Sequence, residues 1–156
     1  MNNLTIFGNR ALLGGGICAH HNSQVTLNTT IIIDNTASDR RNDVYMSDDA
    51  TLTRTHNIIG MDEDTGNGIV GLADGNDFIG SENMPFDAGL GPLKDFGNGI
   101  PVVTLLPNSP AIDAGTTYDN MPETDAAGNP RVVGRSIDIG AYEYQWPTRR
   151  SGVLTR

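Results

Sequence analysis

A repeat in the first sixty positions constrains the fold more than any other feature. The segment LTIFGN, residues 4 to 9, can be laid over TIIIDN, residues 30 to 35, so that Ile6 meets Ile32 at an offset of 26. Each unit is a short β-branched run, then Asn or Gly, then a second short apolar run, without helical periodicity. This pattern predicts an all-β chain in which each turn of chain stacks on the one before.

Two further matches extend the repeat. GGGICA, residues 14 to 19, matches RNDVYM, residues 41 to 46, and a one-residue gap leaves Ile17 opposite either Val44 or Tyr45. A third unit begins within TLTRTHNIIG, which echoes VTLNTTIII of the second. We therefore predict a short parallel β-helix with two repeats and part of a third. Its leading core candidates are Ile6, Ile17, Val25, Leu27, Ile31 and Ile33. The alternation in VTLNTTIII is imperfect, so an inward set shifted by one residue is an open alternative.

Asn9 and Asn35 fall at the same point of their repeats. Stacked Asn side chains can share amide hydrogen bonds, as they do in cross-β ladders. We interpret the two residues as a structural ladder rather than as a binding site.

The stretch from 61 to 92 is rich in Gly and Asp and is predicted to be a loop, with short strands near 69–70 and 78–79. Asp62 and Asp64 alternate as in cation-binding loops, which makes them weak calcium candidates. The EF-hand pattern fails because a glycine occupies the third ligand position and the closing Glu is missing. We therefore predict neither a metal nor a cofactor.

Two related motifs mark the tail. SPAIDAG contains Asp113 and SIDIGAYE contains Asp138, and the interval between the two acids is close to that of the repeat. Paired carboxylates are what glycosidases use, so a catalytic pair is one interpretation. The flanking Ile and Ala residues place both acids at the core boundary, where an unpaired charge is costly. We therefore expect them to brace the tail against the last repeat, through Arg131 or Arg135 or through backbone amides, and ask whether the two motifs form one final turn of the solenoid.

Composition excludes several classes of function. The net charge is −9 and Lys94 is the single lysine, which argues against nucleic acid as a partner. No apolar run approaches the roughly 20 residues of a membrane span. The start lacks a signal peptide, so we expect this chain to be a fragment of a longer reading frame. Cys18 is the only cysteine and is expected to be a small buried residue.

Five motifs in fixed order, NIIG, GLGPL, LLPNSPAIDAG, TDAAGNPRVVG and DIGAYE, carry a family resemblance. The chain resembles, over roughly residues 4 to 144, the C-terminal region of bacterial right-handed parallel β-helix repeat proteins with a choice-of-anchor Q type domain. These are related to polymorphic outer-membrane protein repeats. The resemblance implies an extracellular or cell-surface protein in which a right-handed β-helix precedes an anchoring module. After Tyr144, however, only QWPTRRSGVLTR remains, without a sorting motif.

The expected organisation follows from these features. We predict β-helix rungs over 1–60, the loop over 61–92, an irregular β capping or anchor-type module over 93–144, and a flexible tail over 145–156. The expected function is a non-catalytic scaffold or adhesin-like part that caps the solenoid and links it to the cell envelope. Its expected partners are surface polysaccharide or the rest of a longer β-helix.

The alternative is a fragment or accessory part of a β-helix enzyme that binds or cleaves polysaccharide. Catalysis needs an acid and a base that converge, and the candidates outside the tail fall in segments expected to be solvated turns. These candidates are His20, His21, Asp34, Asp39, Asp43, Asp48 and Asp49. Nucleophile and phosphate-binding motifs are absent, so the sequence gives no positive indication of an active site.

Overall fold

A computed structural model describes residues 1–40, 42–61 and 76–147. The described part is all-β, as predicted, and contains no helix able to span a bilayer. Its strands are β1 (Thr5–Phe7), β2 (Arg10–Leu13), β3 (Ile17–Ala19), β4 (Gln24–Asn28), β5 (Ile31–Ile33), β6 (Thr36–Arg40), β7 (Val44–Met46), β8 (Thr51–Thr55), β9 (Ile58–Ile59), β10 (Phe78–Ile79), β11 (Leu90–Asp95) and β12 (Pro101–Leu105).

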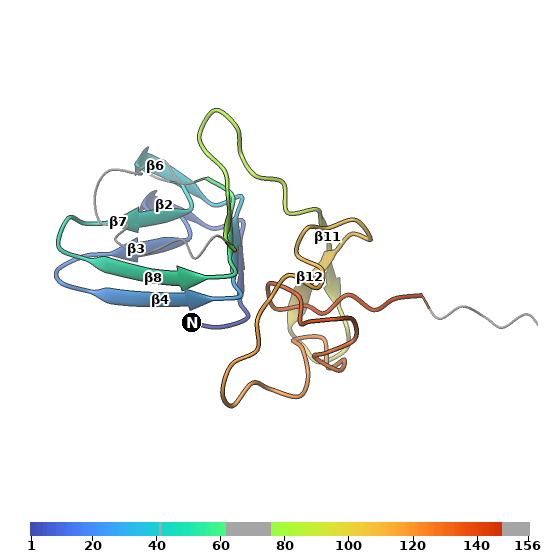
Figure 1. Ribbon diagram of the computed structural model, residues 1–156. Helices are drawn as coiled ribbons and strands as arrows, with labels where there is room; N and C mark the ends of the chain where they lie inside the picture. The colour runs from blue at the N-terminus through green and yellow to red at the C-terminus, as the bar shows by residue number, and fades with distance from the viewer. Residues whose placement is uncertain (41, 62–75, 148–156) are drawn as a thin grey trace, which may run out of the picture.

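Strands of the first repeat lie parallel to those of the second (Figure 1). β1 pairs with β5, β2 with β6, β3 with β7 and β4 with β8. The predicted match of Ile6 with Ile32 is confirmed. Ile17 lies opposite Val44, one position beyond the offset of the first pair, which settles the choice between Val44 and Tyr45. The extra residue enters the second repeat at a register shift in the β2–β6 pair.

The third repeat extends the sheet that begins with the β1–β5 pair. β9 adds to β5 and β10 adds to β9, both in parallel, which gives a four-stranded sheet in the order β1-β5-β9-β10. The short strand expected near 78–79 is therefore confirmed as β10. The other expected strand, near 69–70, lies outside the described residues, as do Asp62, Asp64 and the end of the tail.

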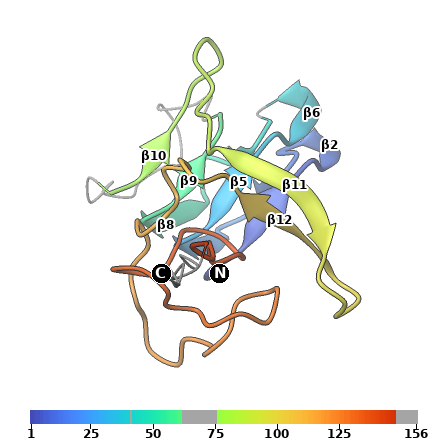
Figure 2. The ribbon, with the colours of Figure 1, turned by 90° about the vertical axis from the view of Figure 1, so that its right-hand side faces the viewer.

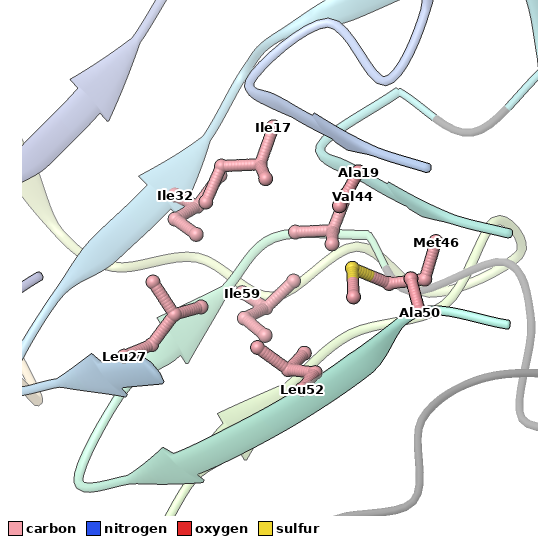
Figure 3. Close-up of a cluster of buried hydrophobic side chains, with 9 residues drawn as sticks. All are labelled: Ile17, Ala19, Leu27, Ile32, Val44, Met46, Ala50, Leu52 and Ile59. Atoms are coloured by element: carbon pink, nitrogen blue, oxygen red, sulfur yellow. The ribbon is translucent and has the colours of Figure 1, made fainter. Parts of the chain in front are cut away.

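One face of this sheet encloses a core with the β3–β7 and β4–β8 sheets (Figure 3). We call this core the inner cluster, and it consists of Ile17, Ala19, Leu27, Ile32, Val44, Met46, Ala50, Leu52 and Ile59. Ile6 and Val25 are partly buried and pack against it. Gly16 lies where the chain must pass close to the second repeat, because a Cβ there would be 2.6 Å from the carbonyl oxygen of Asp43.

The opposite face of the same sheet is covered by the C-terminal module, residues 88–147. The two contribute a second core, the outer cluster, made of Ile31, Ile33, Ile58, Ala88, Leu105, Ala111 and Ile139. Strand β5 is therefore buried on both faces, and all three of its isoleucines are buried. Ile31 and Ile33 were expected to point inward, but they lie in the outer cluster and Ile32 lies in the inner one, so the inward set is shifted by one residue on β5. The alternation is imperfect because a strand covered on both faces needs no polar side.

The C-terminal module contains the antiparallel β11–β12 hairpin and a long irregular segment. Both views show it beside the sheet, with the hairpin crossing its outward face (Figures 1 and 2). The backbone N–H of Gly140 donates to the carbonyl oxygen of Thr29 at 2.8 Å, and that of Ala141 donates to Thr5 Oγ1 at 3.0 Å. These hydrogen bonds reach the first two repeats, and the outer cluster adds Ile58 of the third, the last repeat.

Candidate functional site: the buried acids

The two Ile-Asp-x-Gly motifs lie side by side in the C-terminal module. The N–H of Ile139 donates to the carbonyl oxygen of Ala111, and the N–H of Gly115 donates to that of Ile137, both at 2.9 Å. The residue numbers rise along one segment as they fall along the other, so the two segments run in opposite directions. Successive turns of a solenoid run parallel, so the suggestion that these motifs form one final turn is wrong.

Asp113 closes a tight loop through its carboxylate. Its Oδ1 atom accepts hydrogen bonds from the backbone N–H groups of Arg135 at 2.6 Å and Ser136 at 3.1 Å. Asp113 itself has φ of 57°, a left-handed conformation that Asp tolerates better than most residues. A Cβ at Gly134 would lie 2.0 Å from the Asp113 Oδ1 atom, which explains why this neighbour is a glycine.

Asp138 lies deeper, with 2% of its surface exposed. Its Oδ1 atom accepts the N–H of Asp113 at 2.8 Å, and its Oδ2 atom accepts the N–H of Tyr144 at 2.6 Å. Burial raises the pKa of Asp138, and the two backbone hydrogen bonds oppose that shift. Both carboxylate oxygens are thus used to hold the chain, and neither faces solvent.

Two further acids continue this network. Glu143 Oε2 accepts the N–H of Asp138 at 3.1 Å, and the N–H of Glu143 donates to Asp125 Oδ2 at 2.8 Å. Asp125 Oδ1 in turn accepts the N–H groups of Ala127 at 2.9 Å and Asn129 at 2.8 Å. Burial raises the pKa of Glu143 to about 7. Sequence reasoning missed both acids, although each lies within a tail motif, TDAAGNPRVVG or DIGAYE.

Arg131 is the cation of this network and is itself buried. Its Nη1 atom donates to the carbonyl oxygen of Gly140 at 3.2 Å. Its charge lowers the pKa values of Asp138 and Glu143, although by less than burial raises them. The acids were expected to be held either by arginine side chains or by backbone amides. The hydrogen bonds to the Asp113 and Asp138 carboxylates come from backbone amides. Arg131 acts on Asp138 through its charge. Arg135 contributes its backbone N–H to Asp113.

The asparagine pair forms a second buried polar site, between the repeats. Asn35 Oδ1 accepts both the backbone N–H and the side-chain Nδ2 of Asn9, each at 3.0 Å. Asn35 Nδ2 donates to the carbonyl oxygen of Ile6 at 2.9 Å and to Asp43 Oδ1 at 2.9 Å. Asp43 also accepts the N–H of Met61 at 2.7 Å, and burial raises its pKa. Asp43 was expected in a solvated turn, and that interpretation is wrong because it is fully buried.

The remaining sequence candidates lie at or near the surface. The exposed ones are His21, Asp34, Asp39, Asp48 and Asp49. Cys18 is also exposed, and its Sγ atom lies 3.2 Å from Nε2 of the half-buried His20. The expectation of a buried cysteine failed because Cys18 points outward from β3 between two buried neighbours. Within the described ranges, no group of three or more His, Cys, Asp or Glu residues is placed to hold a metal ion.

A pocket of about 300 Å³ is lined in part by His56, Asp77 and Asp113. Asp77 accepts the N–H of Asn57 at 2.7 Å through Oδ1, and its Oδ2 atom lies 3.2 Å from Arg54 Nε. Both acids of this pocket therefore hold the protein's own backbone or side chains. General acid–base chemistry needs a carboxyl group that can reach a substrate proton, and this arrangement does not favour it.

Comparison of the chain with protein-family models, curated proteins and solved structures finds no match. The family resemblance therefore rests on the sequence motifs alone. The chemistry of the site has to be taken from its own geometry, which is that of a buried network of acids and backbone amides around one arginine.

Proposed function

We propose that this chain is the non-catalytic C-terminal part of a secreted or cell-surface β-helix scaffold of the adhesin type. The observation that carries the proposal is the nearly constant offset between parallel strands of the first and second repeats, which changes by a single position along the repeat. Four consecutive strand pairs keep this offset, which is the pairing expected when whole turns of chain are stacked. The right-handed sense of the helix comes from the family resemblance.

In this proposal, the C-terminal module secures the β-helix from the side. It covers the sheet formed by β1, β5 and β9, a parallel sheet whose apolar outward residues would otherwise be exposed. The acids of the module close its irregular loops, so the covering surface is held in one conformation without regular strands. A rigid side cover of this kind is suited to joining a long solenoid to an envelope anchor.

The commitment of the acids to backbone amides supports a role without catalysis. Asp138 and Glu143 are buried, and each accepts a backbone N–H. A polysaccharide-cleaving enzyme would instead need two carboxyl groups that face a substrate groove at a defined separation. The polysaccharide enzyme is therefore the weaker of the two alternatives.

Labelling of intact cells tests the surface assignment. An antibody raised against this chain should label intact cells of the source organism, and protease added outside the cells should remove the signal. Signal that appears only after permeabilisation would contradict a surface scaffold. Release of reducing sugar from a polysaccharide panel, abolished in Asp113→Ala protein that melts normally, would instead favour the enzyme.

A further inference from the structure

Strand β1 ends the four-stranded sheet and has an open edge. In the order β1-β5-β9-β10, no described strand pairs with the outer side of β1. The N–H of Ile31 donates to the carbonyl oxygen of Leu4 at 2.8 Å, so that carbonyl faces β5. Backbone groups alternate in direction along a strand, so those of Thr5 and Phe7 face the open edge. An open edge of this kind is a template for another strand.

The β11–β12 hairpin overhangs this edge. At its inner end, Leu105 is 6% exposed and belongs to the outer cluster with Ile31 and Ile33. Farther out, Leu93 pairs with Val103 yet is 62% exposed. Figure 2 shows the far end of the hairpin reaching beyond the sheet. Along the hairpin face that Leu105, Val103 and Leu93 share, burial therefore falls from the inner end to the outer end, whereas Val102 on the opposite face is only 4% exposed.

Between the hairpin and β1 lies a groove of about 390 Å³. Its walls are mostly apolar, and they include Leu4, Phe7, Leu93, Ile100 and Val103. Four of its apolar side chains are exposed: Leu4, Phe7, Leu93 and Ile100. The groove therefore combines free backbone hydrogen-bonding groups with apolar walls, which is the combination used in recognition by strand addition.

Asn9 specifies what kind of strand fits. Asn35 Oδ1 accepts two N–H groups from Asn9, the asparagine of the preceding repeat. Asn9 occupies the same position one repeat earlier and is exposed. A strand that lies on the open edge in the same register, and that is followed by Asn, would donate the same two N–H groups to Asn9 Oδ1.

We infer that this groove receives an extended strand of the same repeat type, parallel to β1, with apolar residues at alternate positions and an Asn after it. The pattern is that of IIIDN in the second repeat, residues 31 to 35. The outward side chains of the added strand would pack under Leu93 and Val103, as those of β5 pack in the outer cluster with Leu105. The parallel direction rests on the β-helix assignment in the proposed function.

A peptide titration of the full chain tests this inference. The probe is the peptide TTIIIDNT, with two lysines added for solubility, and the readout is hydrogen exchange and NMR shifts of the labelled protein. We expect exchange of the Thr5 and Phe7 amides to slow by about tenfold or more at saturation, because they gain hydrogen-bond partners. The double variant Leu93→Asp/Ile100→Asp should fold normally, since both side chains are exposed, and should weaken binding by about tenfold or more.

Two matched peptides complete the design. Replacing the peptide's Asn by Ala should weaken binding, and a scrambled peptide should leave the β1 amides unchanged. Unchanged β1 amides with the first peptide, or equal binding by the double variant, would overturn the inference. So would protection of the same amides that rises with protein concentration alone, because a second copy would then occupy the groove. Cell labelling and peptide binding are separate readouts, so failure of the surface assignment is distinguishable from failure of the groove.

Discussion

The backbone N–H of Asp113 donates to Asp138 Oδ1 at 2.8 Å, so the acids of the two Ile-Asp-x-Gly motifs are joined through the main chain. Two carboxyl groups that share a substrate would both face a groove. Here the carboxylate of one acid instead holds the backbone of the other. The contact makes the pair a structural element of the C-terminal module, and its consequences are measurable as stability.

Replacing Asp138 by Asn tests that role. One oxygen that accepts a backbone N–H becomes an NH₂ group, which leaves either the amide of Asp113 or that of Tyr144 without its acceptor. We expect a loss of ~1–3 kcal/mol in the free energy of unfolding, the cost of a buried unsatisfied donor. Urea denaturation would measure it, with Asp48→Asn as the matched control because Asp48 is exposed. Equal midpoints for the two variants would contradict a bracing role.

Replacing Asn35 by Ala should be costly as well. The change removes the acceptor for Asn9 and the donor for Ile6 and Asp43, all at the junction between repeats. We expect a loss of about 2–4 kcal/mol, since several buried groups lose a partner. Asn9→Ala is the control, because the backbone N–H of Asn9 still reaches Asn35 Oδ1, and its cost should stay below ~1 kcal/mol. Thermal melting of both variants measures which one loses more stability. A larger loss for Asn9→Ala than for Asn35→Ala would argue against the ladder.

The stability of the fold should depend on pH through the titration of Glu143. Burial raises its pKa from 4.5 to about 7, so the folded protein holds this proton more tightly than the unfolded chain. Protonated Glu143 therefore adds to the free energy of unfolding below about pH 4.5. This stabilisation is lost as the pH rises to about 7, a change of about 3 kcal/mol.

Glu143→Gln should flatten that part of the stability curve. The Gln side chain keeps an oxygen for the N–H of Asp138 but carries no proton to lose. Urea denaturation at several pH values from 4 to 8 would compare the variant with the parent chain, with exposed Glu82→Gln as the control. If the free energy of unfolding changes with pH as steeply in Glu143→Gln as in the parent chain, this acid does not titrate as its burial implies.

The contact between hairpin and sheet can be tested by two leucines. Leu105 is buried in the outer cluster, whereas Leu93 is 62% exposed. Leu105→Ala should cost about 2–4 kcal/mol, and Leu93→Ala should stay within about 0.5 kcal/mol. Similar losses for the two variants, measured by thermal melting, would mean that the hairpin does not pack as described.

The repeat could be predicted because its signal is local. The match of Ile6 with Ile32 followed from a simple alignment, and the structure confirms the pairing. The later register depended on one extra residue in the second repeat, which an alignment of two units could not place. Ile32 was missed as a core residue because Ile31 and Ile33 were expected to point inward; Ile32 points inward instead, and the other two are buried on the outward face by a part of the chain far away in sequence.

The polar sites were harder to predict for a related reason. Asp43 and Glu143 are buried, and each has a hydrogen-bond partner in another segment, Met61 and Asp125 respectively, which their neighbours in sequence do not reveal. Conversely, Cys18 looks like a core residue by type but faces outward on β3. Burial of a polar residue depends on tertiary contacts, whereas strand position depends on local pattern.

The stacking of the repeats is tested most directly by a disulfide between Cys18 and residue 45. The two residues are partners across the parallel β3–β7 pair, and adjacent strand positions fall within the Cα separation that a disulfide needs. Oxidised Tyr45→Cys protein should form an intrachain bond, seen by mass spectrometry as two thiols protected from alkylation, while Thr53→Cys on β8 should not. Two free thiols in the Tyr45→Cys protein after oxidation, or a bond formed equally well by the Thr53→Cys control, would contradict stacked repeats.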